Sequence, residues 1–231
     1  MQQPTFILTD IEGTTTPKTF VFDVLFPYFL AHLEEIRIHQ NEPDYSKSIQ
    51  LVKETLKEEN GHSSVYFDEV IATLKHWVEI DRKHPALKAL QGLIWEKGYR
   101  KGSLKGVLYD DVPTQLKKWS KDGIKLGVYS SGSVKAQKLL FGFSNSGNFC
   151  TLFSAYFDTA VGHKREVKSY IRIVEELEVE AIEILFLSDI AEELDAAKEA
   201  GMQTAQLIRD ETAVPADNHI QLHSFNEISW K

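Results

Sequence analysis

The chain has 231 residues, of which 42% are hydrophobic and 26% are charged, and its net charge is −8. This length holds one large domain or a domain with an insertion, and the negative charge disfavours nucleic acid or an anionic membrane as a partner. The single cysteine, Cys150, excludes an internal disulfide and is typical of a reducing compartment, so we expect a cytoplasmic protein. No apolar run is long enough to span a bilayer, and the polar N-terminus, which lacks a signal peptide, leads directly into a predicted strand.

The first predicted element is a buried strand, residues 6–9, which ends in the sequence Asp10-Ile11-Glu12-Gly13. Asp10 would lie at the carboxyl end of this strand, where open α/β sheets bind their ligands. Two carboxylates this close repel each other unless they share a cation or a proton, and hard oxygen ligands suit Mg²⁺. The alternative is a strand that ends in a solvated acidic turn, because Asp-x-Glu is a common sequence.

Residues 20–98 show helical patterns and no strand signal. An aromatic-rich stretch over residues 20–30 contains Pro27, which indicates a break or a new first turn. A connection is expected around residues 41–44. The apolar spacing then predicts helices over residues 46–60, 68–81 and 85–97, with Gly61 and Gly98 as stop signals.

Strands and helices alternate in the rest of the chain. Strands are predicted at residues 124–129, 155–158, 184–187 and 204–208, and helices at 113–121, 134–141, 167–177 and 191–200, before a polar tail. This order predicts an α/β fold with a doubly wound, mostly parallel sheet and right-handed crossovers. We expect a catalytic core of residues 1–17 and 100–231, and an inserted all-helical cap of residues 18–99 that covers the carboxyl end of the sheet.

Polar groups follow four of the predicted strands: Asp10 with Glu12, Ser130 with Ser131, Lys164, and Asp189. A parallel sheet places the carboxyl ends of its strands on one edge, so these groups are expected to converge. Their types suit phosphoryl transfer, because a phosphate monoester dianion must be neutralised before an anion attacks it.

The predicted roles follow from this chemistry. Asp10, Glu12 and Asp189 would bind Mg²⁺, with Glu12 contributing its side chain or the adjacent backbone. Ser130, the N–H groups that follow it, and Lys164 would bind the phosphate. Asp10 could then attack phosphorus to form an aspartyl-phosphate, while Glu12 protonates the leaving group and later activates water.

Each of these residues also has a structural alternative. The serines after residue 129 could be helix N-caps, Lys164 could be a solvated loop charge, and Asp189 could cap the helix that follows it. Glu193 is interpreted as a surface acid favoured by the helix dipole, and His163 as an ordinary loop residue.

The motif order Asp-x-Glu-Gly-Thr, Ser-Ser-Gly-Ser, Gly-x-Lys and Ser-Asp resembles the haloacid dehalogenase-like phosphatases. Within them it resembles the enolase-phosphatases, or acireductone synthases, of methionine salvage, and the second acid, Glu12, is the most discriminating feature. The matching segments are Asp10–Pro17, Asp23–Tyr28, Tyr129–Val134, Phe157–Thr159 with Gly162 and Lys164, Phe186–Asp189 with Glu193–Ala197, and Leu90–Gly92 with Trp95, Gly98 and Tyr99.

The resemblance implies a haloacid dehalogenase-like fold with a helical cap, Mg²⁺ on Asp10, Glu12 and Asp189, and phosphate on Ser130, Ser131 and Lys164. It also implies a substrate, 2,3-diketo-5-methylthiopentyl 1-phosphate, which is enolised and then dephosphorylated to 1,2-dihydroxy-3-keto-5-methylthiopentene. The proton removed is acidic because its carbon adjoins a ketone that Mg²⁺ polarises. Glu12 or a cap residue would be the base.

The chain departs from the family pattern at Lys18 and Thr19, at Phe22, and at Ser103 and Val107, which concern the cap rather than the phosphate site. Two alternatives stay open. One is a phosphatase for another small metabolite, acting without enolisation, and the other is a phospho-receiver signalling module. We expect a monomer whose partner is a small phosphorylated metabolite, with no nucleic acid and no membrane involved.

Overall fold

The computed structural model describes residues 1–61, 64–211 and 213–230. The chain divides into two compact units, one made of Met1–Phe20 and Lys105–Lys231 and the other of Val21–Leu104. Each unit is described by itself. Within the described part of the chain, no helix is long and apolar enough to cross a membrane.

The first unit is built on a six-stranded sheet with strand order β3-β2-β1-β4-β5-β6, and every neighbouring pair is parallel. The strands are β1 (Phe6–Thr9), β2 (Lys125–Tyr129), β3 (Phe153–Phe157), β4 (Ile184–Ser188), β5 (Gln203–Leu207) and β6 (Ile220–Leu222). The predicted doubly wound parallel sheet is confirmed. The prediction of a tail without a strand after β5 is wrong, because β6 pairs with β5 from Ala205 to Leu207.

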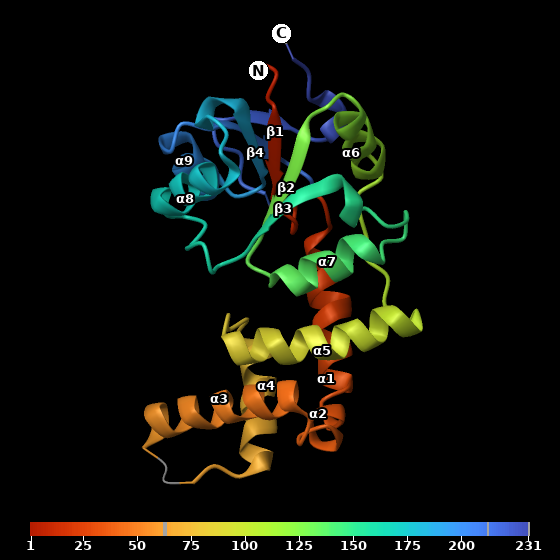
Figure 1. The fold of residues 1–231 in the computed structure, drawn as a ribbon, viewed down its shortest axis with the longest axis vertical. Helices are drawn as coiled ribbons and strands as arrows, with labels where there is room; N and C mark the ends of the chain where they lie inside the picture. Colours follow the sequence, from red (N-terminus) through yellow and green to blue (C-terminus); the bar gives the residue numbers. More distant parts are fainter. Residues whose placement is uncertain (62–63, 212, 231) are drawn as a thin grey trace. The chain divides into compact units, whose positions relative to one another are not determined.

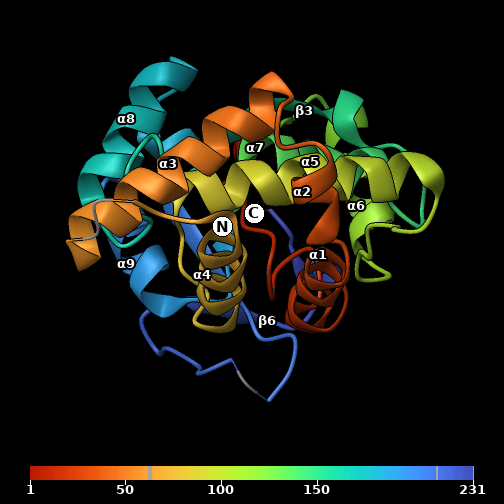
Figure 2. The same ribbon diagram turned by 90° about the horizontal axis from the view of Figure 1, so that it is seen from below.

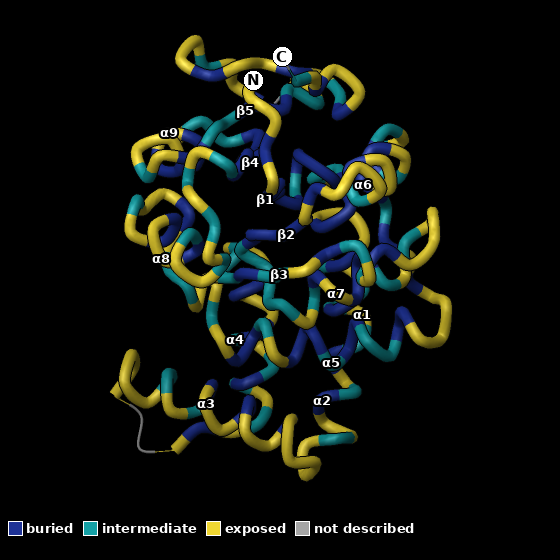
Figure 3. Tube along the Cα trace, turned by 45° about the horizontal axis from the view of Figure 1, so that its top comes forward, coloured by how far each residue is buried: buried dark blue, intermediate teal, exposed yellow. Residues whose placement is uncertain are grey.

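Helices cover both faces of this sheet (Figure 1). Helices α6 (Val112–Lys121) and α7 (Val134–Gly142) lie on one face, and α8 (Val167–Leu177) and α9 (Ala191–Glu199) lie on the other. Short 3₁₀ turns occur at Cys150–Leu152, Ala181–Glu183 and Phe225–Glu227. The strands β1, β2 and β4 are buried along almost their whole length (Figure 3), as expected for apolar strands covered on both faces.

One apolar cluster fills the space between the sheet and the α8–α9 layer. Alternate residues of β1, Phe6 and Leu8, belong to it together with Tyr170 and Ile173 of α8 and Leu194 of α9. Because strand side chains alternate between faces, Ile7 is buried against the opposite layer. Both sides of β1 are therefore fixed by packing, which holds the carboxyl end of this strand in place.

The described residues of the second unit form helices and connecting segments, and no strand. A π-helical turn, η1 (Phe20–Leu25), leads into α1 (Phe26–Ala31), α2 (Glu34–Ile38), α3 (Pro43–Asn60), α4 (Phe67–Glu79) and α5 (Pro85–Lys101). Figure 2 shows α3 and α5 side by side, and their buried residues include Val52 and Leu90.

Two boundaries in this unit differ from the predictions. Residues 43 and 44, predicted in a connection, form the first turn of α3, because Pro43 at N1 already has a helical backbone angle. Gly98 does not stop α5, which continues to Lys101 and ends at Gly102 with φ +76°. Gly98 instead allows close packing, since a Cβ there would lie 2.7 Å from Cζ of Tyr28.

Candidate active site

Asp10 is the first residue beyond β1 and lies buried between the ends of its neighbouring strands. Its N–H donates to the carbonyl of Leu187 in β4 at 2.8 Å, so the sheet ladder continues to this residue. Its own carbonyl accepts hydrogen bonds from the hydroxyls of Thr9 and Thr15 at 2.9 and 3.3 Å. These bonds fix the backbone from which the carboxylate projects.

The turn after Asp10 is tightly closed. The N–H groups of residues 14–16 all donate to the carbonyl of Ile11, and the hydroxyl of Thr15 bonds to the same atom at 3.3 Å. The chain after β5 also holds this turn, because Nε of Arg209 donates to the carbonyl of Thr14 at 3.1 Å. Arg209 is itself held by Asp111, whose Oδ1 lies 2.9 Å from Nη1.

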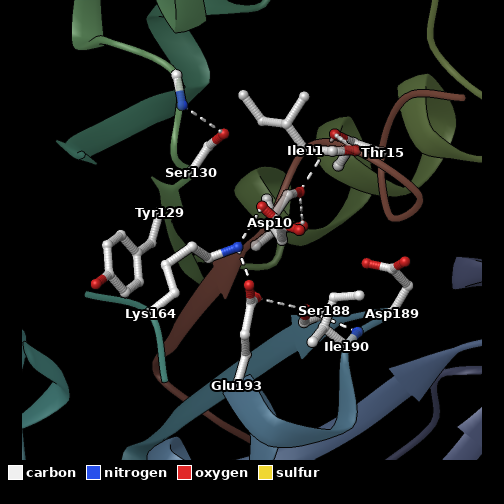
Figure 4. A network of polar contacts seen from close by, with 12 residues as sticks. Asp10, Ile11, Thr15, Tyr129, Ser130, Lys164, Ser188, Asp189, Ile190 and Glu193 are labelled. Atoms are coloured by element: carbon white, nitrogen blue, oxygen red, sulfur yellow. Dashed lines mark hydrogen bonds and ion pairs between the residues drawn. The ribbon is translucent and has the colours of Figure 1, made fainter. Parts of the chain in front are cut away.

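Lys164 is buried at the centre of the site, with 7% of its surface exposed. Its Nζ lies 2.7 Å from Oδ1 of Asp10 and 2.6 Å from Oε2 of Glu193, as Figure 4 shows. Burial by itself lowers the pKa of Lys164, but the two carboxylates outweigh it and raise the pKa above its ordinary value. The alternative of a solvated loop charge is therefore wrong.

Glu193 was interpreted as a surface acid, and the structure overturns this. The side chain comes from the first turn of α9 but points into the site, where Oε2 also accepts a hydrogen bond from the hydroxyl of Ser188 at 2.9 Å. Burial raises the pKa of Glu193 to about 7, with Asp10 adding to the effect and Lys164 opposing it. The sequence signal for Glu193 was Lys164, because a buried ammonium needs nearby carboxylates to balance its charge.

Asp189 follows β4 and has 3% of its surface exposed. The helix-cap alternative is wrong for it, because the N-cap of α9 is Ile190, whose N–H is bound by Ser188. Oδ1 of Asp189 has no hydrogen-bond partner, and Oδ2 forms an ion pair with Nζ of Lys18 at 2.6 Å. Burial, followed by the charge of Asp10, raises the pKa of Asp189, while the two lysines lower it.

The loop after β2 carries the predicted phosphate-binding serines. Ser130 is buried, and its Oγ accepts a hydrogen bond from the N–H of Gly132 at 3.3 Å. Ser133, rather than Ser130 or Ser131, is the N-cap of α7, where its hydroxyl accepts a hydrogen bond from the N–H of Ala136. Ser131 lies half-buried between them. Figure 4 shows Ser130 near Asp10 and Lys164, with its hydroxyl directed toward the N–H of Gly132.

Glu12 lies half-buried in the turn after β1, and its backbone forms a bridge with Thr16. His163 is exposed beside Lys164 and accepts a hydrogen bond from the N–H of Arg165, as an ordinary loop residue does. The structure thus brings Asp10, Lys164, Ser130 and Asp189 to one edge of the sheet, with Glu12 in the adjoining turn.

The donor set at this edge fits a hard divalent cation. Among the described residues no group of three or more His, Cys, Asp or Glu side chains is arranged as a metal cage. The carboxylates of Asp10, Asp189 and Glu193 are nevertheless buried here, and Oδ1 of Asp189 has no hydrogen-bond partner. Mg²⁺ characteristically takes one or two carboxylates and completes its shell with water and substrate phosphate, so it does not need a cage.

Known proteins with similar sequences show the family to which this chain belongs. The model of the haloacid dehalogenase-like hydrolases matches residues 5–201. Proteins named "Enolase-phosphatase E1" from Marinobacter nauticus and Pseudomonas aeruginosa are 51% and 48% identical over 96% of this chain, covering 95% and 96% of their own length. The chain belongs to the enolase-phosphatase family of haloacid dehalogenase-like hydrolases. The crystal structure of the UTR4 protein from Saccharomyces cerevisiae is 31% identical and matches with a TM-score of 0.77, covering 98% of this chain and 100% of that one.

Membership of this family confirms the predicted resemblance, fold class and enzymatic activity. The protein is an enolase-phosphatase of methionine salvage, and the phospho-receiver alternative is excluded. Enzymes of this family generally depend on a metal ion and act on a small phosphorylated substrate.

Proposed function

We propose that the enzyme converts 2,3-diketo-5-methylthiopentyl 1-phosphate to 1,2-dihydroxy-3-keto-5-methylthiopentene and phosphate, with Mg²⁺ as its metal ion. The observation that supports this most strongly is the buried triad of Asp10, Lys164 and Glu193, in which one ammonium lies within 2.7 Å of two carboxylates. A site of this kind holds a nucleophilic acid ionised in a position where an anionic phosphate can be bound next to it.

The residue roles in this proposal follow the geometry. Asp10 and Asp189 would hold Mg²⁺ through carboxylate oxygens, with Glu12 contributing its side chain or backbone carbonyl. Ser130, Ser131 and Lys164 would bind the phosphate. When bound, Mg²⁺ supplies positive charge to the phosphate and polarises the substrate ketone.

The dephosphorylation needs two displacements at phosphorus. Asp10 Oδ forms a bond to phosphorus as the bond to the enol oxygen breaks, and Glu12 gives its proton to that oxygen. A water molecule then attacks phosphorus and releases Asp10, and Glu12 takes up the proton that water loses. In the earlier enolisation a base removes the proton from the carbon that bears the phosphate ester, and Glu12 is our candidate.

The proposal also covers the role of the helical unit, the oligomeric state and the cellular compartment. We propose that the helical unit is a cap that excludes water from the enol and packs the methylthio group. We further propose that the enzyme is a monomer and works in the cytoplasm, which the single, unpaired cysteine favours.

The decisive experiment is an assay of the diketone phosphate as a function of Mg²⁺, with ultraviolet detection of the enol and of the acireductone. We expect Asp10→Asn to lower phosphate release at least about a thousandfold, because the amide cannot act as the nucleophile. Circular dichroism checks that the variant is folded, and Asp122→Asn, an exposed change at the end of α6, serves as the matched control. Undiminished turnover by Asp10→Asn, or hydrolysis without enol absorbance, would contradict the proposal.

A further inference from the structure

A second lysine enters the site from a different direction than Lys164. Nζ of Lys18 lies 2.6 Å from Oδ2 of Asp189, and 29% of the Lys18 side chain is exposed against 2% for Asp189. The two lysines thus have different partners, since Lys164 contacts Asp10 and Glu193.

Gly13 makes this second contact sterically possible. It has φ +77°, and a Cβ added to it would lie 2.6 Å from Oδ2 of Asp189 and 2.7 Å from Cε of Lys18. The end of the lysine stem and the carboxylate therefore meet over a residue without a side chain. The ammonium thus occupies one oxygen of the carboxylate that is proposed to bind the metal ion.

The charges around the Lys18 ammonium favour its position beside Asp189, and its partial exposure allows it to leave that position. Burial by itself lowers the pKa of Lys18, but Asp189, then Asp210 and Asp10, outweigh it and raise the pKa. The lysine stem is a flexible four-carbon chain, and 29% of the Lys18 side chain is exposed. The ammonium can therefore leave Asp189 for solvent.

We propose that Lys18 is an internal counter-ion that competes with the divalent metal ion for Asp189 and so lowers the metal affinity of the enzyme. This inference rests on the proposed role of Asp189 as a metal ligand. In the metal-free protein the ammonium neutralises a carboxylate that would otherwise be buried without a partner. At a separation of about 4 Å, the Coulomb repulsion between a divalent cation and an ammonium is large enough, even at the dielectric constant of water, to change the affinity at least about tenfold.

The test measures metal binding itself, by isothermal titration of the metal-free full-length protein with magnesium chloride and by the rise in Tm that Mg²⁺ produces. Lys18→Met and Lys18→Gln are expected to bind Mg²⁺ about tenfold more tightly than the wild type. Lys18→Arg, which keeps the charge, should stay near the wild-type affinity. Lys125→Met removes the same charge from an exposed position at the far end of β2 and should also leave the affinity unchanged.

Every outcome bears on the inference. An unchanged affinity in both neutral Lys18 variants would overturn it, and a weaker affinity would instead make Lys18 a residue that orients Asp189 for the metal. Asp189→Asn separates this inference from the proposed function, because it should abolish the binding if Asp189 is a ligand. Wild-type affinity in Asp189→Asn would overturn the proposed metal site, whereas loss of binding there with no change in the Lys18 variants would overturn the counter-ion alone.

Discussion

Lys164 is the residue on which the charge balance of the site most directly depends. Its ammonium is shared between Asp10 and Glu193, and all three side chains are buried. A buried ion pair is a weak source of stability, but removing one partner leaves an uncompensated buried charge. Because Lys164 is also proposed to bind the phosphate, its effects on folding and on ligand binding can be tested separately.

Replacement of Lys164 by Met is expected to raise KM for the diketone phosphate at least about tenfold, because a charge-assisted contact to the phosphate is lost. The same change should lower the free energy of unfolding by about 3–5 kcal/mol, since two carboxylates lose their partner. Steady-state kinetics and urea unfolding measure the two effects. Adding Glu193→Gln should restore part of the stability but not the affinity.

Lys168→Met is the matched control for this experiment, because Lys168 is an exposed residue of α8. A double-mutant cycle between positions 164 and 193 should give a coupling free energy of about 0.5–3 kcal/mol. Additive effects of the two changes, or an unaltered KM in Lys164→Met, would mean that the lysine neither bridges the acids nor reaches the phosphate.

The residues that the sequence predicts well are those at the ends of strands. Asp10, Ser130 and Asp189 follow apolar runs directly, and the parallel sheet brings such positions together. Glu193 and Lys18 escape this argument, because one lies inside a helix and the other after a turn. The direction of Glu193 depends on how α9 packs on the sheet, and that of Lys18 on its contact with Asp189 over Gly13, and the local sequence pattern encodes neither contact.

At the scale of single elements, α5 begins with an unusual cap. Nδ1 of His84 accepts a hydrogen bond from the N–H of Ala86 at 3.2 Å, while Nε2 lies 3.1 Å from the hydroxyl of Thr55 and the ring packs on Trp77. Burial lowers the pKa of His84 below 6.5, and the charge of Arg82 adds to this effect. The neutral imidazole is therefore the form that the folded state favours.

The lowered pKa of His84 predicts that the free energy of unfolding depends on pH. A lowered folded-state pKa means that the contribution of His84 to stability is complete above about pH 6.5 and is lost as the pH falls through the lower value. We expect His84→Asn to remove this loss, because an asparagine caps a helix at any pH. Urea unfolding between about pH 5 and pH 8 should show the wild type losing up to about 1 kcal/mol more than the variant, the value of a typical cap.

His76→Asn provides the control, since His76 lies on α4 with 63% of its side chain exposed. Its pH profile should match that of the wild type. If His84→Asn also keeps the wild-type profile, the cap does not depend on the neutral imidazole.

The element boundaries show where local signals stop being sufficient. Glycine is a common helix stop signal, yet α5 continues through Gly98. The glycine is used there for packing, since Tyr28 lies where a Cβ would be. The strand β6 has only three residues and lies in a polar tail, so no apolar run marks it. It forms because β5 offers an unpaired edge, which is a property of the sheet rather than of the segment.

For the whole molecule, the important consequence of the topology is that segments far apart in the chain meet at one edge of the sheet. Residues 10–16, 130–134 and 189–193 each follow a different strand, and they meet only because β1, β2 and β4 are adjacent and parallel. The alternation of strands and helices predicts this convergence. It does not predict the charge balance, which requires Lys18 and Glu193 as well.

Hydrogen–deuterium exchange of the full-length protein tests this convergence directly. Saturation with Mg²⁺ and orthophosphate is expected to slow exchange in all three segments together, because a ligand that binds only the folded arrangement stabilises every part that contacts it. At about one hundred times the dissociation constant the protection should rise by up to about a hundredfold. Peptides around Ala181–Glu183, at the opposite end of β4, should change little and serve as the internal reference. Protection limited to one segment, or equal protection at both ends of the strands, would show that the ligand is not held by the carboxyl edge of the sheet as a unit.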